Sequence, residues 1–220
     1  RTPEDVWTPE MRLTNPLVQV EPSCQVIQDN ITKDLATFEI KDSVDTLPFA
    51  PETMDQNIMT IKTRVNISCA TMGQDQRHRS IKRGSPVITG NFYLPPLLKG
   101  AGLQKVAEEY IKDYANLAKE GISAPLMTTI APYGLMVSYE KEANVNALLH
   151  EQGKRLCWCA QEEISEVSRQ LREEIRENHP QLAEKLAPPC FHGKCQEGVR
   201  FCGRQINKNL VANYFVKRRV

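Results

Sequence analysis

Hydrophobic and polar positions alternate most clearly between residues 58 and 68. Every second position there carries a side chain suited to one buried face: Ile61, Thr63, Val65 and Ile67. Residues two apart share one face of an extended chain, so the pattern predicts a strand over Ile58–Ser68. The following residues, Ala70–Arg79, are expected to turn helical before Gly84-Ser85-Pro86 breaks the helix.

Weaker alternation predicts three further strands, at Val18–Val20, Leu35–Ile40 and Leu135–Tyr139. Helical spacing is clearest over Leu103–Lys119, where apolar positions recur three and four residues apart. These positions are Leu103, Val106, Ala107, Tyr110, Ile111, Tyr114 and Leu117. We expect Gly121 to end this helix.

Two more helical segments follow. A short helix is expected over Ser123–Ile130, because Pro132 ends it. The longest segment runs from Ala143 to about Asn178, with Gly153 as its one weak point and His179-Pro180 as its end.

This order of elements places strands early and helices late, which favours an α+β fold with a mixed or antiparallel sheet and long helices. We divide the chain into an N-terminal arm (1–34), one domain (35–204) and a C-terminal tail (205–220). The arm is assigned because its pattern is weak and it contains Pro and Asn residues.

Composition narrows the class of protein. The 220 residues include 25% charged and 40% hydrophobic residues, as in ordinary globular proteins, and the net charge of +1 gives no field to attract nucleic acid. No apolar run approaches the roughly 20 residues needed to span a bilayer, and no signal peptide is visible. With an odd count of seven cysteines, we expect a reducing cytoplasm. Because the chain starts at Arg1 without Met, it is expected to be a trimmed or processed product or a piece of a longer polypeptide.

Candidate chemistry lies in two separate stretches. The first is Gln74-Asp75-Gln76-Arg77-His78-Arg79, and the second joins Arg155 to Ala160-Gln161-Glu162-Glu163-Ile164. Clustered guanidinium groups suit phosphates or the electron-rich edge of a reduced ring. Taken alone, an Arg-His-Arg tripeptide is more often a solvated basic turn.

The spacing of these stretches resembles that of one enzyme family. Gln-x-x-Arg-His-Arg at Gln74–Arg79, Tyr-x-x-Leu-x-x-x-Gly-Ile at Tyr114–Ile122 and the Asn-rich helix with Ala-Gln-x-Glu-Ile at Asn144–Ile164 are similar to flavin-dependent thymidylate synthases. The tail Pro188–Arg204 also resembles the ending of many members. The resemblance covers roughly residues 58–204.

The resemblance implies a fold like the thymidylate synthase complementing protein and an oligomer, such as a tetramer, whose active sites combine several subunits. It also implies reductive methylation of dUMP to dTMP. FAD would be reduced by NADPH, and methylenetetrahydrofolate would supply the one-carbon group.

Residue roles follow from the resemblance alone. The flavin contacts would be Arg77, His78, Arg79, Asn144, Asn146 and His150. Gln74 would contact the nucleotide. Arg155 would contact the pyrimidine and favour its anionic form, which makes it the expected catalytic residue. Asn144 and Arg155 are expected on one helix face, nearly three turns apart.

The chain departs from the family after the Arg-His-Arg motif. The run Ser80–Thr89 lacks the Glu, the second Ser and the Arg that clasp dUMP in the family, and Thr128 stands where the family has another arginine. Lys82 and Arg83 are candidate replacement phosphate contacts. Three explanations stay open: a partner domain completes the site, another nucleotide is the substrate of a divergent flavoprotein, or the chain is a non-catalytic structural subunit.

The cysteine-rich tail gives a last candidate site. Cys190, His192, Cys195 and Cys202 offer a Cys₃His set for zinc, with a disulfide or plain packing of free thiols as the alternatives. Cys157 and Cys159 are expected in the core, because two residues apart on a helix they face away from each other.

Overall fold

The computed structural model describes residues 10–11, 18–31, 59–193, 195 and 197–204. The predicted strand Leu35–Ile40 lies outside these residues, as does the tail 205–220. The described strands are β1 (Glu10–Met11), β2 (Ser23–Asp29), β3 (Thr60–Ser68), β4 (Lys82–Arg83), β5 (Val87–Phe92) and β6 (Leu135–Asn144). The helices are α2 (Cys69–Asp75), α3 (Pro96–Gly100), α4 (Gln104–Lys119), α5 (Ala124–Thr129), α6 (Val145–Arg155), α7 (Glu162–Asn178) and α8 (Pro180–Lys185), with single 3₁₀ turns at Pro189–Phe191 and Gly198–Arg200.

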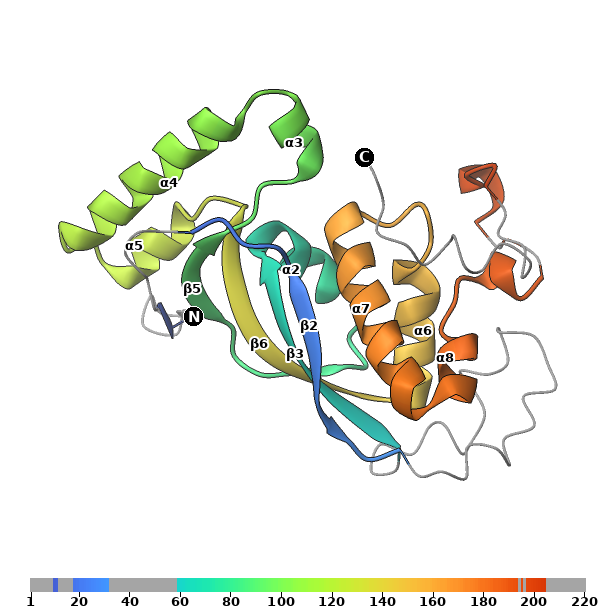
Figure 1. Cartoon of the computed structure of the whole chain (residues 1–220). Helices are drawn as coiled ribbons and strands as arrows, with labels where there is room; N and C mark the ends of the chain where they lie inside the picture. The colour runs from blue at the N-terminus through green and yellow to red at the C-terminus, as the bar shows by residue number, and fades with distance from the viewer. Residues whose placement is uncertain (1–9, 12–17, 32–58, 194, 196, 205–220) are drawn as a thin grey trace.

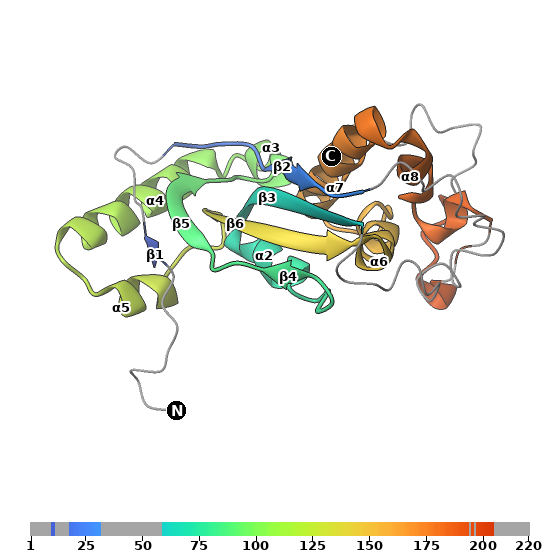
Figure 2. The same ribbon diagram turned by 90° about the horizontal axis from the view of Figure 1, so that it is seen from below.

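The described residues form one curved, six-stranded sheet in the order β1-β5-β6-β3-β2, with β4 also paired to β6 (Figure 1). The pairs β2–β3, β3–β6, β4–β6 and β5–β6 are antiparallel, while the short β1 runs parallel to β5. Figure 2 shows α4 and α5 at one end of this sheet and α6 to α8 at the other. The predicted α+β class with a mixed sheet is confirmed.

The long central strands bury one face by simple alternation. The predicted strand at 58–68 is confirmed as β3, and Ile61, Val65 and Ile67 are at most 2% exposed. Its partner β6 runs from Leu135 to Asn144, longer than the predicted Leu135–Tyr139, and also alternates. Apolar side chains of the two strands pack against α6 and α7 to form the main core.

Helix α7 covers the edge strand β2. The side chain of Gln170 accepts a hydrogen bond from the Cys24 backbone N–H at 2.9 Å, and Glu174 accepts one from Val26 N–H at 2.5 Å. Such partners satisfy edge groups that would otherwise pair with another chain. The prediction that this part of residues 1–34 is an irregular arm was therefore wrong at Ser23–Asp29. Val18–Val20 makes only a single bridge, from Gln19 to Phe92.

The long helix predicted over Ala143–Asn178 is two helices. Asn144 ends β6 and caps α6, because its Oδ1 accepts from Ala147 N–H at 2.8 Å. A turn over 156–161 then separates α6 from α7. The break falls there and not at Gly153, where a Cβ would make only an ordinary 3.7 Å contact with Ala187 O.

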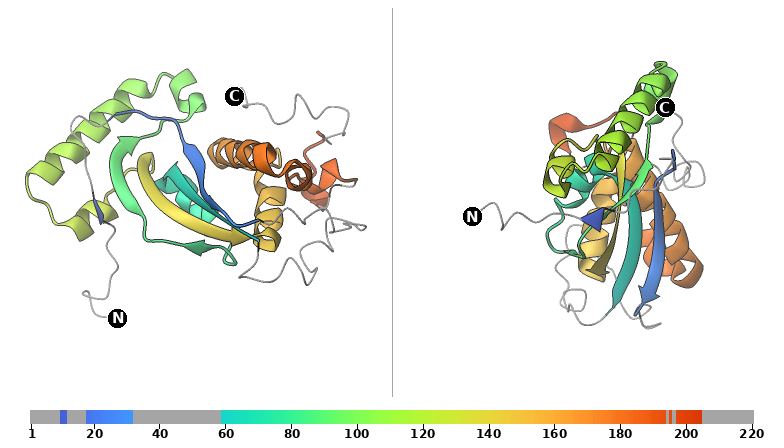
Figure 3. Two further views of the ribbon diagram at one scale, coloured as in Figure 1. Left: turned by 60° about the horizontal axis from the view of Figure 1, so that its bottom comes forward. Right: turned by 90° about the vertical axis from the view of Figure 1, so that its left-hand side faces the viewer.

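Helix α4 begins and ends close to its predicted bounds, but its apolar stripe is only partly covered. Ile111 and Tyr114 are buried, whereas Val106 is 60% and Tyr110 55% exposed. Figure 3 shows α4 extending away from the sheet at the end opposite to α7. Within the described part of the chain, no helix is both long and apolar enough to cross a membrane.

Candidate active site

A cavity of about 710 Å³ lies where α2, the end of α6 and the 156–161 turn meet. Its lining includes four cationic side chains, Arg77, Lys154, Arg155 and Arg200, and one carboxylate, Glu197. Gln74 and His78 complete the wall that α2 and its following turn provide. Lys154 pairs with Glu197 at 2.8 Å. The remaining positive charge makes the cavity suited to an anion.

Arg155 enters this cavity from the C-terminal end of α6. Its Nη2 donates to the Gln74 carbonyl at 2.5 Å, which joins two stretches 81 residues apart. Its Nε is buried and has no hydrogen-bond partner among the described residues. Burial lowers the pKa of Arg155, opposed by the Glu151 and Asp75 carboxylates. One nitrogen of this guanidinium is thus buried without a partner among the described residues.

His78 is buried beside Arg155 and His150. Its ring meets the His150 ring edge to face, with centroids 5.3 Å apart. Burial, followed by the charges of Arg155 and His150, lowers the pKa of His78 to about 4. The imidazole is therefore neutral at neutral pH and can either donate or accept a hydrogen bond.

Arg83 is occupied inside the protein and is not a replacement phosphate contact. It donates to the Asp75 carboxylate at 2.6 Å and to three carbonyls, those of Asp75, His78 and Ile81. These bonds hold the turn that carries Arg-His-Arg. Arg83 was a candidate phosphate contact in the sequence, because the carbonyl partners of its guanidinium depend on how this turn folds.

Beneath this turn lies a buried ionic network. Lys141 donates to Asp75 at 2.8 Å and to Glu151 at 2.6 Å, and Tyr139 donates to Asp75 at 2.7 Å. Burial alone would raise the pKa of Asp75, but Lys141 and Arg83 outweigh it and hold that pKa well below its usual range. The network fixes Asp75 and so fixes the turn that Arg83 ties to it.

The other predicted flavin and phosphate contacts lie outside the cavity. Arg79 and Lys82 are exposed, and Lys82 pairs through its backbone with Glu142 of β6. Asn144 and Asn146 are at the start of α6, and the 11-residue helix separates Asn144 from Arg155 by about 16 Å. The expected shared face of Asn144 and Arg155 therefore does not bring both to one cavity. His150 joins the site only through its contact with His78.

The zinc set is not assembled. Among the described residues, no three His, Cys, Asp or Glu side chains are placed to hold a metal ion. Cys190 is buried in the main core, and His192 lies 3.3 Å from the Lys185 carbonyl. The expectation for Cys157 and Cys159 was also wrong, because both lie in the turn after α6 and line the cavity.

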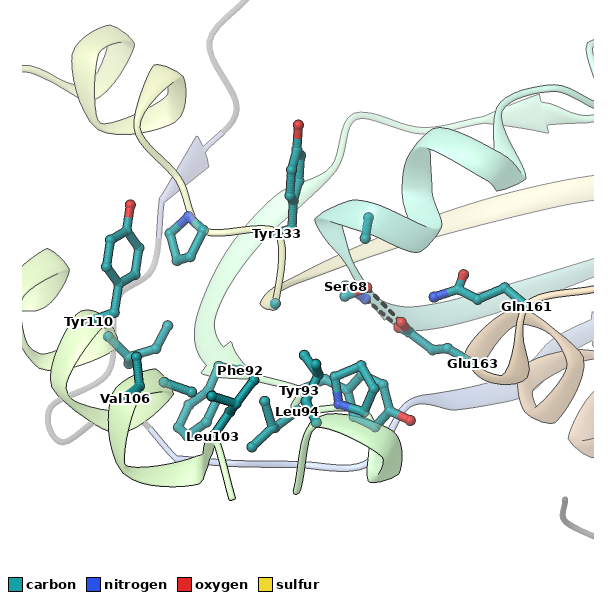
Figure 4. Close-up of a pocket in the computed structure, with 17 residues that line it drawn as sticks. Ser68, Phe92, Tyr93, Leu94, Leu103, Val106, Tyr110, Tyr133, Gln161 and Glu163 are labelled. Carbon is teal, nitrogen blue, oxygen red and sulfur yellow. Dashed lines mark hydrogen bonds between the residues drawn. The ribbon is translucent and has the colours of Figure 1, made fainter. Parts of the chain in front are cut away.

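A second, apolar cavity of about 460 Å³ lies beside α4 (Figure 4). Aromatic and aliphatic side chains dominate it, among them Phe92, Tyr93, Tyr110 and Tyr133. Gln161 lines both cavities, so they adjoin at this residue. The two together suit a ligand that combines an anionic group with a planar or apolar part.

Glu163 also borders the apolar cavity, but its charge is used within the fold. Its carboxylate accepts from the Ser68 N–H, the Ser68 hydroxyl and the Thr71 hydroxyl, each at 2.6 Å. Ser68 in turn caps α2. The motif Ala160–Ile164 therefore fixes the start of α2 as well as supplying Gln161 to the cavities.

Several cavity residues were not predicted from the sequence. Lys154 and Gln161 lie within the Asn144–Ile164 motif region but were given no role, although the motif spacing was a usable signal. Glu197 and Arg200 had no local signal, because they reach the cavity only through the path of the C-terminal segment.

Comparison with solved structures shows the same fold elsewhere. The UMP/dUMP methylase PolB from Streptomyces cacaoi bound with 5-Br UMP matches with a TM-score of 0.56 and 14% identity, covering 81% of this chain and 96% of that chain. The same methylase bound with 5-Br dUMP matches with a TM-score of 0.56 and 13% identity, covering 80% and 96%. No curated protein sequence matches the chain.

The family comparison agrees with the resemblance seen in the motifs. The model of the thymidylate synthase complementing protein matches residues 52–181, which include the Arg-His-Arg turn, Arg155 and Gln161. This match spans more than half of the chain, and the chain therefore belongs to the thymidylate synthase complementing protein family.

Proposed function

We propose that the chain is an FAD-dependent methyltransferase that converts dUMP to dTMP. The observation that carries the proposal is the meeting of Gln74, Arg77 and Arg155 in one cationic cavity. The solved relative in this fold is named a UMP/dUMP methylase, which supports a uracil nucleotide as the substrate class.

The nucleotide would be held by its charges and its ring edge. Arg77 and Arg200 supply donors to the phosphate, and the side-chain amide of Gln74 can pair with the pyrimidine. Arg155 would donate to the pyrimidine and stabilise negative charge on it, which raises the reactivity of the ring toward the one-carbon group.

The residues present fit a flavin in part. Arg77 offers a cation, and neutral His78 offers a ring nitrogen, with His150 beside it. These three would hold the flavin, whereas the Asn144 carbonyl oxygen already caps α6. When bound, the flavin supplies reducing equivalents that it receives from NADPH, and methylenetetrahydrofolate supplies the carbon.

Further copies would complete the site. The run Ser80–Thr89 lacks the family's nucleotide clasp, and Arg79 and Lys82 are exposed away from the cavity. We therefore propose a homo-oligomer, or an assembly with a complementary domain, in which a neighbouring chain contributes the missing donors.

The experiment supplies the purified chain with FAD, NADPH, methylenetetrahydrofolate and dUMP. Formation of dTMP, detected by mass spectrometry, together with dUMP-stimulated NADPH oxidation, is the expected result. Methylation of UMP alone would assign the same chemistry to another nucleotide. If the chain neither forms product nor takes up flavin, the second candidate is favoured, a non-catalytic subunit. The missing clasp in Ser80–Thr89 points to this candidate.

A further inference from the structure

Two thiols, Cys157 and Cys159, line the cationic cavity, and a third, Cys202, lies on the segment that carries Arg200; the proposed chemistry uses none of them. Cys157 and Cys159 belong to the turn between α6 and α7 and line the cavity together with Arg200. Cys159 is exposed, while Cys157 and Cys202 are partly buried. None of these three described cysteines is in a disulfide.

The segment that carries Cys202 runs along this turn. The Cys159 thiol donates to the Arg200 carbonyl at 3.7 Å. The Arg204 guanidinium lies over the Trp158 ring, 5.5 Å from its centroid. Because Cys202 is midway between these two anchors in the sequence, the geometry holds it beside the turn.

Direct interaction between the sulfurs supports this placement. What little burial Cys159 has, together with hydrogen bonding to the thiols of Cys157 and Cys202, raises the pKa of Cys159. The same segment is also tied to α6, because Glu197 pairs with Lys154 at 2.8 Å. Glu197 and Arg200 of this segment thus contribute to the wall of the cavity.

We propose that Cys159 and Cys202 form a reversible disulfide that pins residues 198–204, and with them Arg200, to the wall of the cationic cavity. The oxidant that modifies this pair is a low-molecular-weight disulfide such as oxidised glutathione. The Cys159 thiolate attacks one sulfur and releases one reduced glutathione, leaving a mixed disulfide. The Cys202 thiolate then displaces the second glutathione, so two protein thiols are oxidised and one glutathione disulfide is reduced.

Exposure sets this pair apart from the core thiols. Cys24 and Cys190 are buried, and burial raises the pKa of Cys24 to about 12. Buried thiols of this kind stay protonated and out of reach of the oxidant. They serve as internal controls in the same molecule.

Peptide mapping tests the bond directly. The full chain is treated with oxidised glutathione, blocked with N-ethylmaleimide and cut with trypsin. The expected product links the peptide 156–169 to the peptide 201–204, and fragmentation assigns the bond to Cys159. The link should persist in Cys157→Ser, and in Cys202→Ser only a mixed glutathione adduct on Cys159 should remain. A Cys157–Cys159 bond, or mixed adducts alone in the unaltered chain, would overturn the proposal.

A binding measurement tests the pinning. Inorganic phosphate is titrated into the oxidised and the reduced chain by calorimetry. Oxidation should tighten binding about two- to tenfold, the gain expected from immobilising one long side chain in advance. The Cys202→Ser chain cannot form the bond and should not show this tightening. Equal affinities in both states of the unaltered chain would refute the pinning, and neither measurement depends on flavin binding or methyl transfer.

Discussion

At the residue scale, Arg155 ties the end of α6 to α2 through Gln74 O, and we propose that the same planar group binds the ligand. Replacing it by Lys keeps the charge but removes the fork that joins Gln74 O to a ligand. We expect Arg155→Lys to weaken dUMP binding by about tenfold, as for one lost charge-assisted hydrogen bond. Calorimetric titration measures the effect, with Arg176→Lys on the exposed face of α7 as the matched control. Unchanged affinity in Arg155→Lys would remove Arg155 from the site.

His78 gives a pH-dependent prediction. The folded imidazole protonates near pH 4 and the unfolded one near pH 6.5, so the unfolded chain binds more protons between these values. Stability must therefore fall as the pH is lowered from about 6.5 to 4. Between pH 7 and pH 5, His78→Gln should lose about 1 to 2 kcal/mol less of its free energy of unfolding than the unaltered chain does. Urea unfolding at both pH values measures it, and an identical loss in the variant would contradict a buried neutral His78.

Individual site residues could be predicted only where a motif preserved them. Gln74, Arg77 and Arg155 were predicted as ligand contacts from the family resemblance, and the structure brings them to one cavity. Arg83 was misread because its guanidinium binds carbonyls of a turn whose shape no local pattern encodes. Arg200 was missed for the same reason, since a long segment places it.

At the scale of elements, the buried network between α2, β6 and α6 supports the cavity from below. Lys141→Met would leave the carboxylates of Asp75 and Glu151 buried without their shared cation. We expect a loss of about 3 to 5 kcal/mol in the free energy of unfolding. Lys62→Met is the control, because Lys62 pairs with Glu140 at the surface and should cost no more than about 1 kcal/mol. Equal losses in the two variants, measured by denaturant titration, would show that the network is dispensable.

Elements with a strong period could be predicted, and those shaped by tertiary contacts could not. β3, α4 and α5 follow the alternation or helical spacing of their residues. β5 was not predicted because its apolar run is short and is interrupted by Gly90 and Asn91. The division between α6 and α7 depends on the turn over 156–161, which a helical pattern in the sequence conceals.

At the scale of the whole molecule, the exposed apolar side of α4 bears on assembly. We expect the chain to self-associate, and Val106→Glu with Tyr110→Glu should shift it to smaller species without unfolding it, because both side chains are exposed. Size-exclusion chromatography with light scattering measures the mass. Lys112→Glu, on another side of α4, should leave the mass unchanged. A monomeric unaltered chain would contradict the expectation.

The α+β class and the family could be predicted because local periods and motif spacing survive in a divergent chain. The zinc prediction rested on spacing in the sequence, which does not show where the side chains lie. In the structure Cys190 packs in the core, while Cys202 lies on the segment that runs along the α6–α7 turn. Convergence in space, which decides a site, is a property of the whole fold.

Flavin binding tests the central claim most directly. The chain is titrated with FAD, and uptake is followed by flavin absorption and fluorescence. We predict that the unaltered chain binds FAD and that Arg77→Ala loses at least about tenfold in FAD affinity. The control is Arg64→Ala, because Arg64 pairs with Glu140 at the surface; this variant should bind FAD as the unaltered chain does. Equal FAD affinity in Arg77→Ala and the unaltered chain would contradict a flavin site built around the Arg-His-Arg turn.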